Sequence, residues 1–189
     1  MKSIKTILFC GFALFLLVQS YYLIDSFPRL GLEPESLSLS LLLAFLTNLF
    51  ITGFFAFPGF VLPTHKVLPA VYYRIRNPKV LTKTYDILGV SYFKILLLLT
   101  FWGVEKNRKK YFDGTRQGIN NLNYQTKQSE FGHLGAFVLV QITANLALYH
   151  GLIWVAAFTS IMNFFSNFYP IILQRYHRIR TGRFTDRLT

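Results

Sequence analysis

The sequence predicts an all-α integral membrane protein with four transmembrane helices plus one interfacial or re-entrant helix in the cytoplasmic loop. Apolar residues make up 52% of the 189 residues and gather in long runs. The charged residues, with a net charge of +12, lie between those runs. A helix needs about 20 apolar residues to cross a hydrocarbon layer of ~30 Å. This distribution is not that of a soluble nucleic-acid-binding protein, and we expect a single membrane domain over residues 1–189.

The first span is expected at residues 4–24. No charge follows Lys5 within it, and Tyr21 and Tyr22 near its end fit the aromatic belt at a membrane surface. The end of the segment lacks the small residues of a signal-peptide cleavage site. We therefore interpret it as a span that is retained.

A short acidic loop and a second span follow. Residues 25–36 carry one basic and three acidic side chains together with two prolines, which favours a loop on the outer side. The second span is expected at 37–62 and contains Asn48 near its middle. An isolated amide inside the bilayer usually bridges two helices, and we assign that role to Asn48.

The region from 63 to 130 holds twelve basic residues against four acidic ones, which favours a cytoplasmic location. Within it, residues 87–104 are mainly apolar. If this segment crossed the membrane, the basic cluster 106–110 would lie on the opposite side from the basic residues in 66–83. The positive-inside rule disfavours that arrangement, so we interpret 87–104 as an interfacial or re-entrant helix.

The last two spans are expected at 131–149 and 152–173, and a tight turn at His150–Gly151 joins them. A basic tail, 174–189, follows. With four spans, the amino terminus, the 63–130 region and the tail all lie on the cytoplasmic side of the cell (inner) membrane.

Polar side chains occupy one face of the last span and of the start of its tail. At about 100° per residue, steps of four, three, four and four bring together Asn163, Asn167, Pro170, Gln174 and Arg178. Polar groups in a membrane need partners or water. Two interpretations fit. The face is either a helix-packing seam followed by a basic end that binds anionic membrane lipids, or one wall of a polar site at the membrane surface.

The hairpin turn places a histidine opposite this polar stripe. His133 lies 17 residues before position 150 and Asn167 lies 17 after it, so two antiparallel helices bring them to the same depth. Glu130 neighbours His133 on the helix surface, and a carboxylate there can orient an imidazole as a general base. The pair also fits an interfacial ion pair. Half of a di-iron site would need a second such pair, which the sequence lacks.

Other reactive residues have local explanations. Cys10 is the single cysteine, which rules out an internal disulfide. No zinc, P-loop or dinucleotide spacing occurs, so neither a metal nor a cofactor is expected. The remaining histidines lie at a span end, in the turn and in the basic tail, and they are His65, His150 and His177.

The arginines of the tail divide into two groups by helical position. Arg175 and Arg180 lie off the polar stripe, and we expect both to reach lipid phosphates. Arg178 lies on the stripe and can hold an anionic group through more than one hydrogen bond.

Two motifs in the second half of the chain resemble a known family. The first is Asn167, then six residues, then Gln174–Arg175–Tyr176–x–Arg178–x–Arg180. The second is Thr126–Lys127–Gln128–Ser129–Glu130–Phe131–Gly132–His133, with Asp113–Gly114 upstream of it. Over roughly residues 102–180, this pattern is similar to that of the glycosyl-4,4'-diaponeurosporenoate acyltransferases.

The resemblance implies a membrane-embedded acyltransferase. Its acceptor would be a sugar hydroxyl of a carotenoid glycoside, or of a related lipid glycoside, and the product would be the fatty acyl ester. Acyl-CoA or a similar acyl donor would be the co-substrate. A site at the cytoplasmic boundary suits both an apolar acceptor in the bilayer and a soluble anionic donor.

The resemblance also suggests roles for the residues above. His133, oriented by Glu130, would remove the hydroxyl proton as the oxygen attacks the acyl carbonyl. Binding of substrate and oxyanion falls to Asn163, Asn167, Gln174 and Arg178. Arg178 and the lysines of 106–110 would hold the phosphates of the donor.

Two other functions stay open. An isoprenoid-lipid methyltransferase or reductase would use a similar polar hairpin end, but it needs a nucleotide cofactor for which the sequence has no motif. A non-enzymatic membrane scaffold subunit would use the polar stripes only as contacts between helices.

Four spans with both termini in the cytoplasm are a testable topology. In a Cys10→Ser background, an Arg108→Cys variant should react with an impermeant thiol reagent only from the cytoplasmic side, because Lys and Arg favour that side. The measurement compares labelling of intact cells with labelling of inverted vesicles. Reaction of this cysteine from outside alone would show that 87–104 crosses the membrane.

Overall fold

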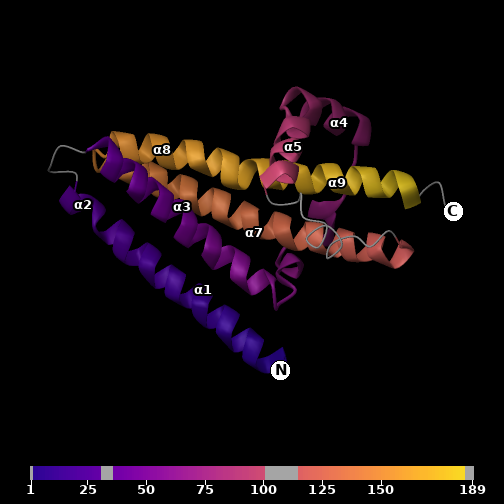
Figure 1. Ribbon diagram of the computed structural model, residues 1–189, viewed down its shortest axis with the longest axis horizontal. Coiled ribbons are helices and arrows are strands. Elements are labelled where there is room, and N and C mark those ends of the chain that lie inside the picture. The colour runs from indigo at the N-terminus through magenta and orange to yellow at the C-terminus, as the bar shows by residue number, and fades with distance from the viewer. Residues whose placement is uncertain (1, 31–35, 101–114, 186–189) are drawn as a thin grey trace. The chain divides into compact units, whose positions relative to one another are not determined.

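A computed structural model describes residues 2–30, 36–100 and 115–185, and the regular elements in these ranges are all helical (Figure 1). The long ones are α1 (Lys2–Asp25), α3 (Leu37–Gly59), α7 (Arg116–Tyr149) and the run of α8 (Ile153–Asn163), η3 (Phe164–Phe168) and α9 (Tyr169–Thr185). The short ones are α2 (Phe27–Leu30), η1 (Thr64–Val67), η2 (Ala70–Tyr73), α4 (Pro78–Ile87) and α5 (Val90–Thr100). Four helices in these ranges are long and apolar enough to cross a membrane. The all-α membrane fold class is thereby confirmed.

Three elements differ from the expected ones by more than a few residues. Helix α7 begins at Arg116 rather than at 131, α9 extends the last helix to Thr185, and α2 lies within the expected loop 25–36. Hydropathy marks the part of a helix that can lie in hydrocarbon, whereas helix formation needs only good helix formers and no internal proline. The polar stretch before residue 131 meets that weaker condition, since it has no proline and includes three Gln residues together with Arg116, Lys127 and Glu130.

The described part of α5 is shorter than a membrane span. Its eleven residues extend about 17 Å, against a hydrocarbon thickness of ~30 Å. Gly89, with a φ of 71°, makes the turn that separates α5 from α4. Residues 101–104 of the expected helix lie outside the described ranges, and the location of this helix at the membrane surface stays a prediction.

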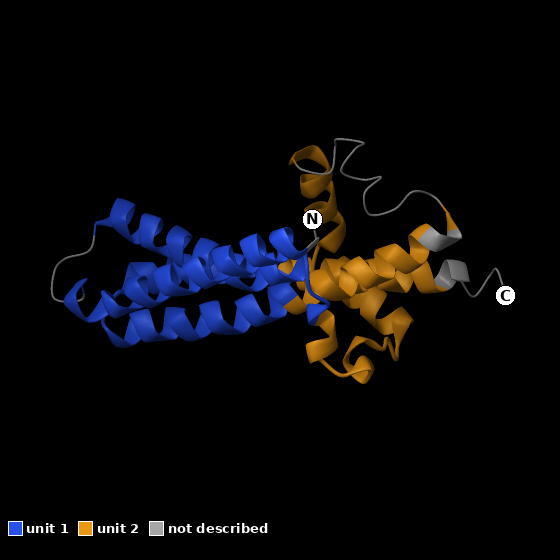
Figure 2. Ribbon diagram, turned by 90° about the horizontal axis from the view of Figure 1, so that it is seen from below, with its two compact units in different colours: residues 1–64, 132–168 blue, residues 65–131, 169–189 orange. Residues whose placement is uncertain are grey.

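The chain divides into two compact units (Figure 2). Unit 1 consists of residues 1–64 and 132–168, and unit 2 of residues 65–131 and 169–189. The apolar core of unit 1 is built from Phe27, Leu43, Ala147, Leu152, Val155 and Ala156. Buried apolar residues of unit 2 include Tyr73, Tyr85, Val90, Ile172 and Ile179.

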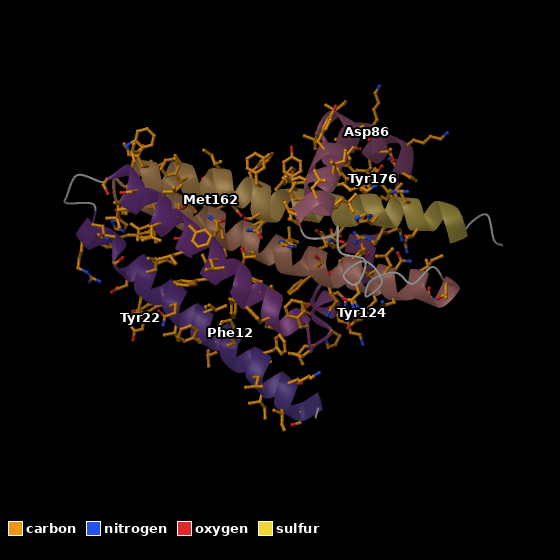
Figure 3. The ribbon with its side chains drawn as sticks, viewed as in Figure 1. Phe12, Tyr22, Asp86, Tyr124, Met162 and Tyr176 are labelled. Carbon is orange, nitrogen blue, oxygen red and sulfur yellow. The ribbon has the colours of Figure 1, made fainter. Side chains whose placement is uncertain are left out.

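Helix α3 is the centre of unit 1. It packs against both α1 and α8, and Figure 1 shows α1 alongside it. Phe12 of α1 meets Phe57 of α3 edge to face, with ring centroids 4.7 Å apart. Tyr22, also on α1, projects outward and is exposed, as expected for a residue of an aromatic belt (Figure 3).

Helix α7 ends in a Schellman motif at the turn that leads to α8. Gly151 has a φ of 82°, a backbone conformation that favours glycine. The Gly151 N–H donates to the Leu148 carbonyl and the Leu152 N–H to the Ala147 carbonyl, each at 3.0 Å. Leu152 and Ala147 belong to the same apolar core. This closed turn fixes the register of the two antiparallel helices and confirms the predicted tight hairpin.

Unit 2 is organised around α9, which packs against α4 and α5. The Tyr169 hydroxyl donates to the Leu88 carbonyl at 2.8 Å, and the Tyr169 ring lies 4.9 Å from that of Phe93. These contacts hold the start of α9 against the turn that joins α4 to α5.

Glycines on α7 let it approach α3 closely within unit 1. A Cβ added at Gly135 would lie 2.4 Å from the Phe55 ring, and one added at Gly132 would lie 3.5 Å from the Phe55 carbonyl oxygen. Small residues at such positions are the usual way in which membrane helices pack against each other.

We expect Gly135→Ala to lower the stability of the purified protein in detergent, because the added methyl group overlaps the Phe55 ring. The cost should be about 1–3 kcal/mol, measured as a reduced midpoint of thermal unfolding. Gly11→Ala is the control, since nothing lies within 4 Å of a Cβ added there. A Phe55→Ala background should abolish the difference. If Gly135→Ala is equally costly in that background, the close contact is not the cause.

Candidate functional site

A polar network lies among the three helices α3, α7 and α8–η3 of unit 1. Its centre is formed by Asn163 and Asn167, both 0% exposed. The Nδ2 group of Asn167 lies 3.0 Å from Oδ1 of Asn163. Two amides four residues apart on one helix face are neighbours, and here they hydrogen-bond to each other as well as to the adjacent helices.

His133 of α7 joins this network. Its Nδ1 atom lies 3.0 Å from Oδ1 of Asn167. The equal counts from the hairpin turn predicted that these two residues lie on facing surfaces at the same depth, and this contact confirms the prediction. The His133 side chain is partly exposed, whereas that of Asn167 is fully buried.

A backbone carbonyl fixes the direction of the hydrogen bonds that run from Asn163 through Asn167 to His133. The Phe137 carbonyl can only accept, so Asn163 presents its Nδ2 group to it, at 2.9 Å. Asn163 therefore presents Oδ1 to Asn167, and Asn167 presents its own Oδ1 to His133. An amide oxygen cannot donate, so the ring carries its proton on Nδ1. In the neutral ring, Nε2 is then the atom with a lone pair.

Asn167 uses its N–H groups within the network. Its Nδ2 atom lies 3.1 Å from the Thr52 hydroxyl oxygen of α3 and 3.3 Å from that of Ser166, in addition to the contact with Asn163. Two N–H bonds serve three acceptors, so little donor capacity remains for an oxyanion. In this geometry Asn167 orients His133.

Asn48 connects α3 to the helix that follows α7. Its Nδ2 group donates to the Thr159 carbonyl at 3.2 Å, and its Oδ1 accepts from the Ser166 hydroxyl at 3.4 Å. The role predicted for Asn48, a bridge between helices, is confirmed. Farther toward the hairpin turn, Gln141 of α7 donates to the Ser160 hydroxyl at 3.2 Å.

The segment η3, which carries Asn167, is a π-helical turn. The α-helical donor to the Ser166 carbonyl would be the N–H of residue 170, and Pro170 has none. A π-helical turn inside an α-helix is frequent at functional sites, and hydropathy gives no sign of it.

Unit 2 contains a separate ionic cluster centred on Glu130, which is 0% exposed. Its Oε1 accepts from Arg175 Nε at 2.7 Å, and its Oε2 accepts from Nη2 of Arg178. The interpretation of Arg175 as a residue that reaches lipid phosphates is therefore wrong, because the buried carboxylate needs cationic partners. Glu130 was also expected to orient His133. Both oxygens of Glu130 are engaged by arginines, whereas Nδ1 of His133 lies 3.0 Å from Oδ1 of Asn167.

Two tyrosines of η2 cover the guanidinium groups. The centre of the Arg175 guanidinium lies 4.8 Å from the Tyr72 ring centroid, and that of Arg178 lies 5.7 Å from the Tyr73 ring centroid. Burial, followed by the charge of Glu130, raises the pKa of Tyr73 to about 12. The Tyr73 hydroxyl therefore stays protonated, and it donates to the His65 carbonyl at 3.0 Å.

The remaining polar contacts of unit 2 tie its helices together. Gln174 Nε2 donates to the Ser129 hydroxyl at 3.2 Å. Gln128 Oε1 lies 2.7 Å from both the backbone nitrogen and Nδ1 of His65. Both contacts join α7 to other elements of the unit, and they agree with the local role expected for His65.

The structure shows residues near Glu130 that the sequence interpretation missed. Tyr72, Tyr73 and Arg175 were not expected near Glu130, because cation–π partners so distant in sequence leave no spacing signal. The lysines of 106–110, expected to hold donor phosphates, lie outside the described residues. Within the described ranges, no group of three or more His, Cys, Asp or Glu side chains could hold a metal ion.

The sequence of residues 69–187 matches the family described as glycosyl-4,4'-diaponeurosporenoate acyltransferase (CrtO). The match covers more than half of the 189 residues. The chain belongs to this family. The family match includes both motifs noted in the sequence and extends to the amino-terminal side of them. No curated protein and no solved structure gives a significant match.

We expect neutral His133 to carry its proton on Nδ1. The measurement is the ¹⁵N chemical shifts of histidine-labelled protein in micelles, with His133→Gln to assign the signal. Asn167→Leu should abolish the preference, because the acceptor that imposes it is gone. His150→Gln is the control and should leave the signal in place. A His133 ring protonated on Nε2 in the wild type would contradict the direction deduced for the network.

Proposed function

We propose that the protein is a membrane-embedded acyltransferase that esterifies a sugar hydroxyl of a carotenoid glycoside, or of a related lipid glycoside, with a fatty acyl group. The observation that supports it most is the amide-oriented His133. A histidine whose Nδ1–H is held by a buried amide presents Nε2 as a base, as in the nucleophile–base–orienter arrangement of acyl-transfer enzymes. Membership of the family supports the reaction class.

In the proposed reaction, Nε2 of His133 accepts the hydroxyl proton while the hydroxyl oxygen attacks the acyl carbonyl carbon. The new C–O bond gives a tetrahedral intermediate with a negatively charged oxygen. Its collapse breaks the bond to the carrier, and the leaving group takes the proton from the imidazolium. With a thioester donor such as acyl-CoA, the products are the ester and the free thiol, and His133 returns to its neutral form. The step uses neither a metal nor a further cofactor.

The other candidate residues take roles suited to their contacts. Asn167 and Asn163 position His133, because their hydrogen-bonding groups are already engaged with each other and with the protein. Glu130 supports catalysis indirectly, as the anion that holds Arg175 and Arg178. Gln174 is partly exposed, and its role as an oxyanion donor stays a prediction from the sequence.

The location that we propose follows from charge. The basic side chains favour a cell (inner) membrane location with both termini in the cytoplasm, where anionic lipids attract them. A glycoside with a long apolar chain is supplied from the bilayer, and a phosphorylated acyl donor from the cytoplasm. No feature of the described residues suggests a nucleic-acid partner.

His133→Gln should reduce acyl transfer about 10²–10⁴-fold, because it removes the base while preserving a polar side chain of similar size. Asn167→Ser should also reduce turnover, through loss of the orienting amide. The measurement is transfer from acyl-CoA to a lipid glycoside in detergent micelles across pH. Wild-type activity should rise with pH as the unprotonated imidazole appears.

The control is His150→Gln, a histidine change in the hairpin turn, which should retain wild-type turnover. A His133→Gln protein that folds and keeps near-normal turnover would overturn the proposed mechanism. Comparing the lipids of cells with and without the protein separates the alternatives. Loss of an acylated glycoside supports acyl transfer, loss of a methylated or reduced isoprenoid supports the cofactor-dependent alternative, and unchanged lipids support the scaffold.

A further inference from the structure

The ionic cluster of unit 2 contains a buried arginine whose hydrogen-bonding capacity is only partly used. The Arg178 side chain is 6% exposed, and its Nη2 atom donates to Glu130. Its Nε and Nη1 atoms are buried and have no hydrogen-bond partner among the described residues. A guanidinium carries one N–H on Nε and two on Nη1. Three charged N–H bonds are thus left without an acceptor, a costly arrangement in a buried site.

The charges of the cluster do not balance. One carboxylate, Glu130, faces the two guanidinium groups of Arg175 and Arg178. The Lys127 ammonium adds a third positive charge, 5.8 Å from the Tyr73 ring centroid. Asp86, the other described acidic residue of unit 2, is exposed on α4 (Figure 3). Counted over the described residues alone, the cluster therefore has both unused donors and uncompensated positive charge.

An anion would correct both deficits. A phosphate group suits them best, because it carries negative charge on several oxygens around one centre and can accept more than one N–H bond from a single guanidinium. The rings of Tyr72 and Tyr73 limit the access of water to the guanidinium groups, which strengthens each contact with a bound anion.

We propose that Arg178, supported by Arg175 and Glu130, forms a binding subsite for a phosphate group. This inference rests on the proposed function in one respect only, which is that a phosphorylated acyl carrier is one source of the phosphate. The headgroup of an anionic phospholipid is the other. In either case Glu130 holds the two arginines in place and also competes with the incoming phosphate for Arg178.

Inorganic pyrophosphate is the probe for this subsite, used with the full-length protein in detergent at constant ionic strength. It should raise the midpoint of thermal unfolding of the wild type, since a ligand that binds the folded state stabilises it. Arg178→Lys should need about tenfold more pyrophosphate for the same effect, because lysine keeps the charge but lacks the unused guanidinium donors. Arg180→Lys is the matched control, since Arg180 is exposed on the same helix, and should behave as the wild type.

A second variant keeps the test decisive if Arg178→Lys does not fold. Glu130→Gln keeps a side chain of the same size with an acceptor oxygen for the arginines, but it removes the competing negative charge, so it should bind pyrophosphate more tightly. The proposal would be overturned if pyrophosphate raised the midpoint equally in the wild type and in Arg178→Lys. It would also be overturned if Arg180→Lys lost as much of this shift as Arg178→Lys, or if Glu130→Gln bound pyrophosphate no more tightly than the wild type. These readouts need no acyl transfer, so this inference and the proposed function can fail independently.

Competition identifies the source of the phosphate. Displacement of pyrophosphate by coenzyme A supports the site as that of a soluble phosphorylated carrier. Displacement by phosphatidylglycerol in nanodiscs, but not by coenzyme A, supports a lipid headgroup instead. Displacement by neither would overturn the assignment.

Discussion

The one-way hydrogen bond from Asn163 to the Phe137 carbonyl determines the chemistry of the polar network in unit 1. An amide side chain can be turned either way, so a chain of amides has no intrinsic direction. Because the Phe137 carbonyl can only accept, it sets the direction of the hydrogen bonds, and Asn163 and Asn167 pass this direction on to His133. In water such a preference would be weak, because solvent could satisfy either orientation. In a buried site among membrane helices the alternative leaves groups unpaired, which costs several kcal/mol.

The buried charges of the ionic cluster in unit 2 need partners, as the buried amides of unit 1 do. Glu130 is fully buried, and a buried carboxylate is stable only with cationic partners. Arg175 and Arg178 supply them, and the tyrosines of η2 cover the pair. The amide network and the ionic cluster differ in how many of their hydrogen-bonding groups have partners. The amide network uses its donors and acceptors internally, which suits a positioning device, whereas Arg178 retains donors, which suits the binding of a ligand.

Hydropathy, the hairpin turn and equal residue counts were sufficient to predict four membrane-spanning helices and the contact between His133 and Asn167. Both predictions depend on the rise per residue of an α-helix, which is the same for every sequence. The partner of Glu130 could not be obtained in that way. Arg175 is 45 residues away on another helix, and its direction depends on how the helices of unit 2 pack. The early start of α7 at Arg116 was missed because hydropathy measures suitability for lipid and not helix formation. The π-helical turn depends on a missing N–H at Pro170, and periodicity arguments assume an unbroken α-helix.

That π-helical turn has a consequence for how the sequence can vary. Phe164 and Phe165 are exposed, so many apolar side chains could replace them without disturbing the amides beneath. The number of residues between the two amides cannot change in the same way, because each residue turns a helix by about 100°. Removing one residue between Asn163 and Asn167 would rotate the second amide away from both His133 and Thr52, although no functional side chain had been changed. Within this protein, Phe164–Phe168 acts as a spacer in which length is more constrained than composition.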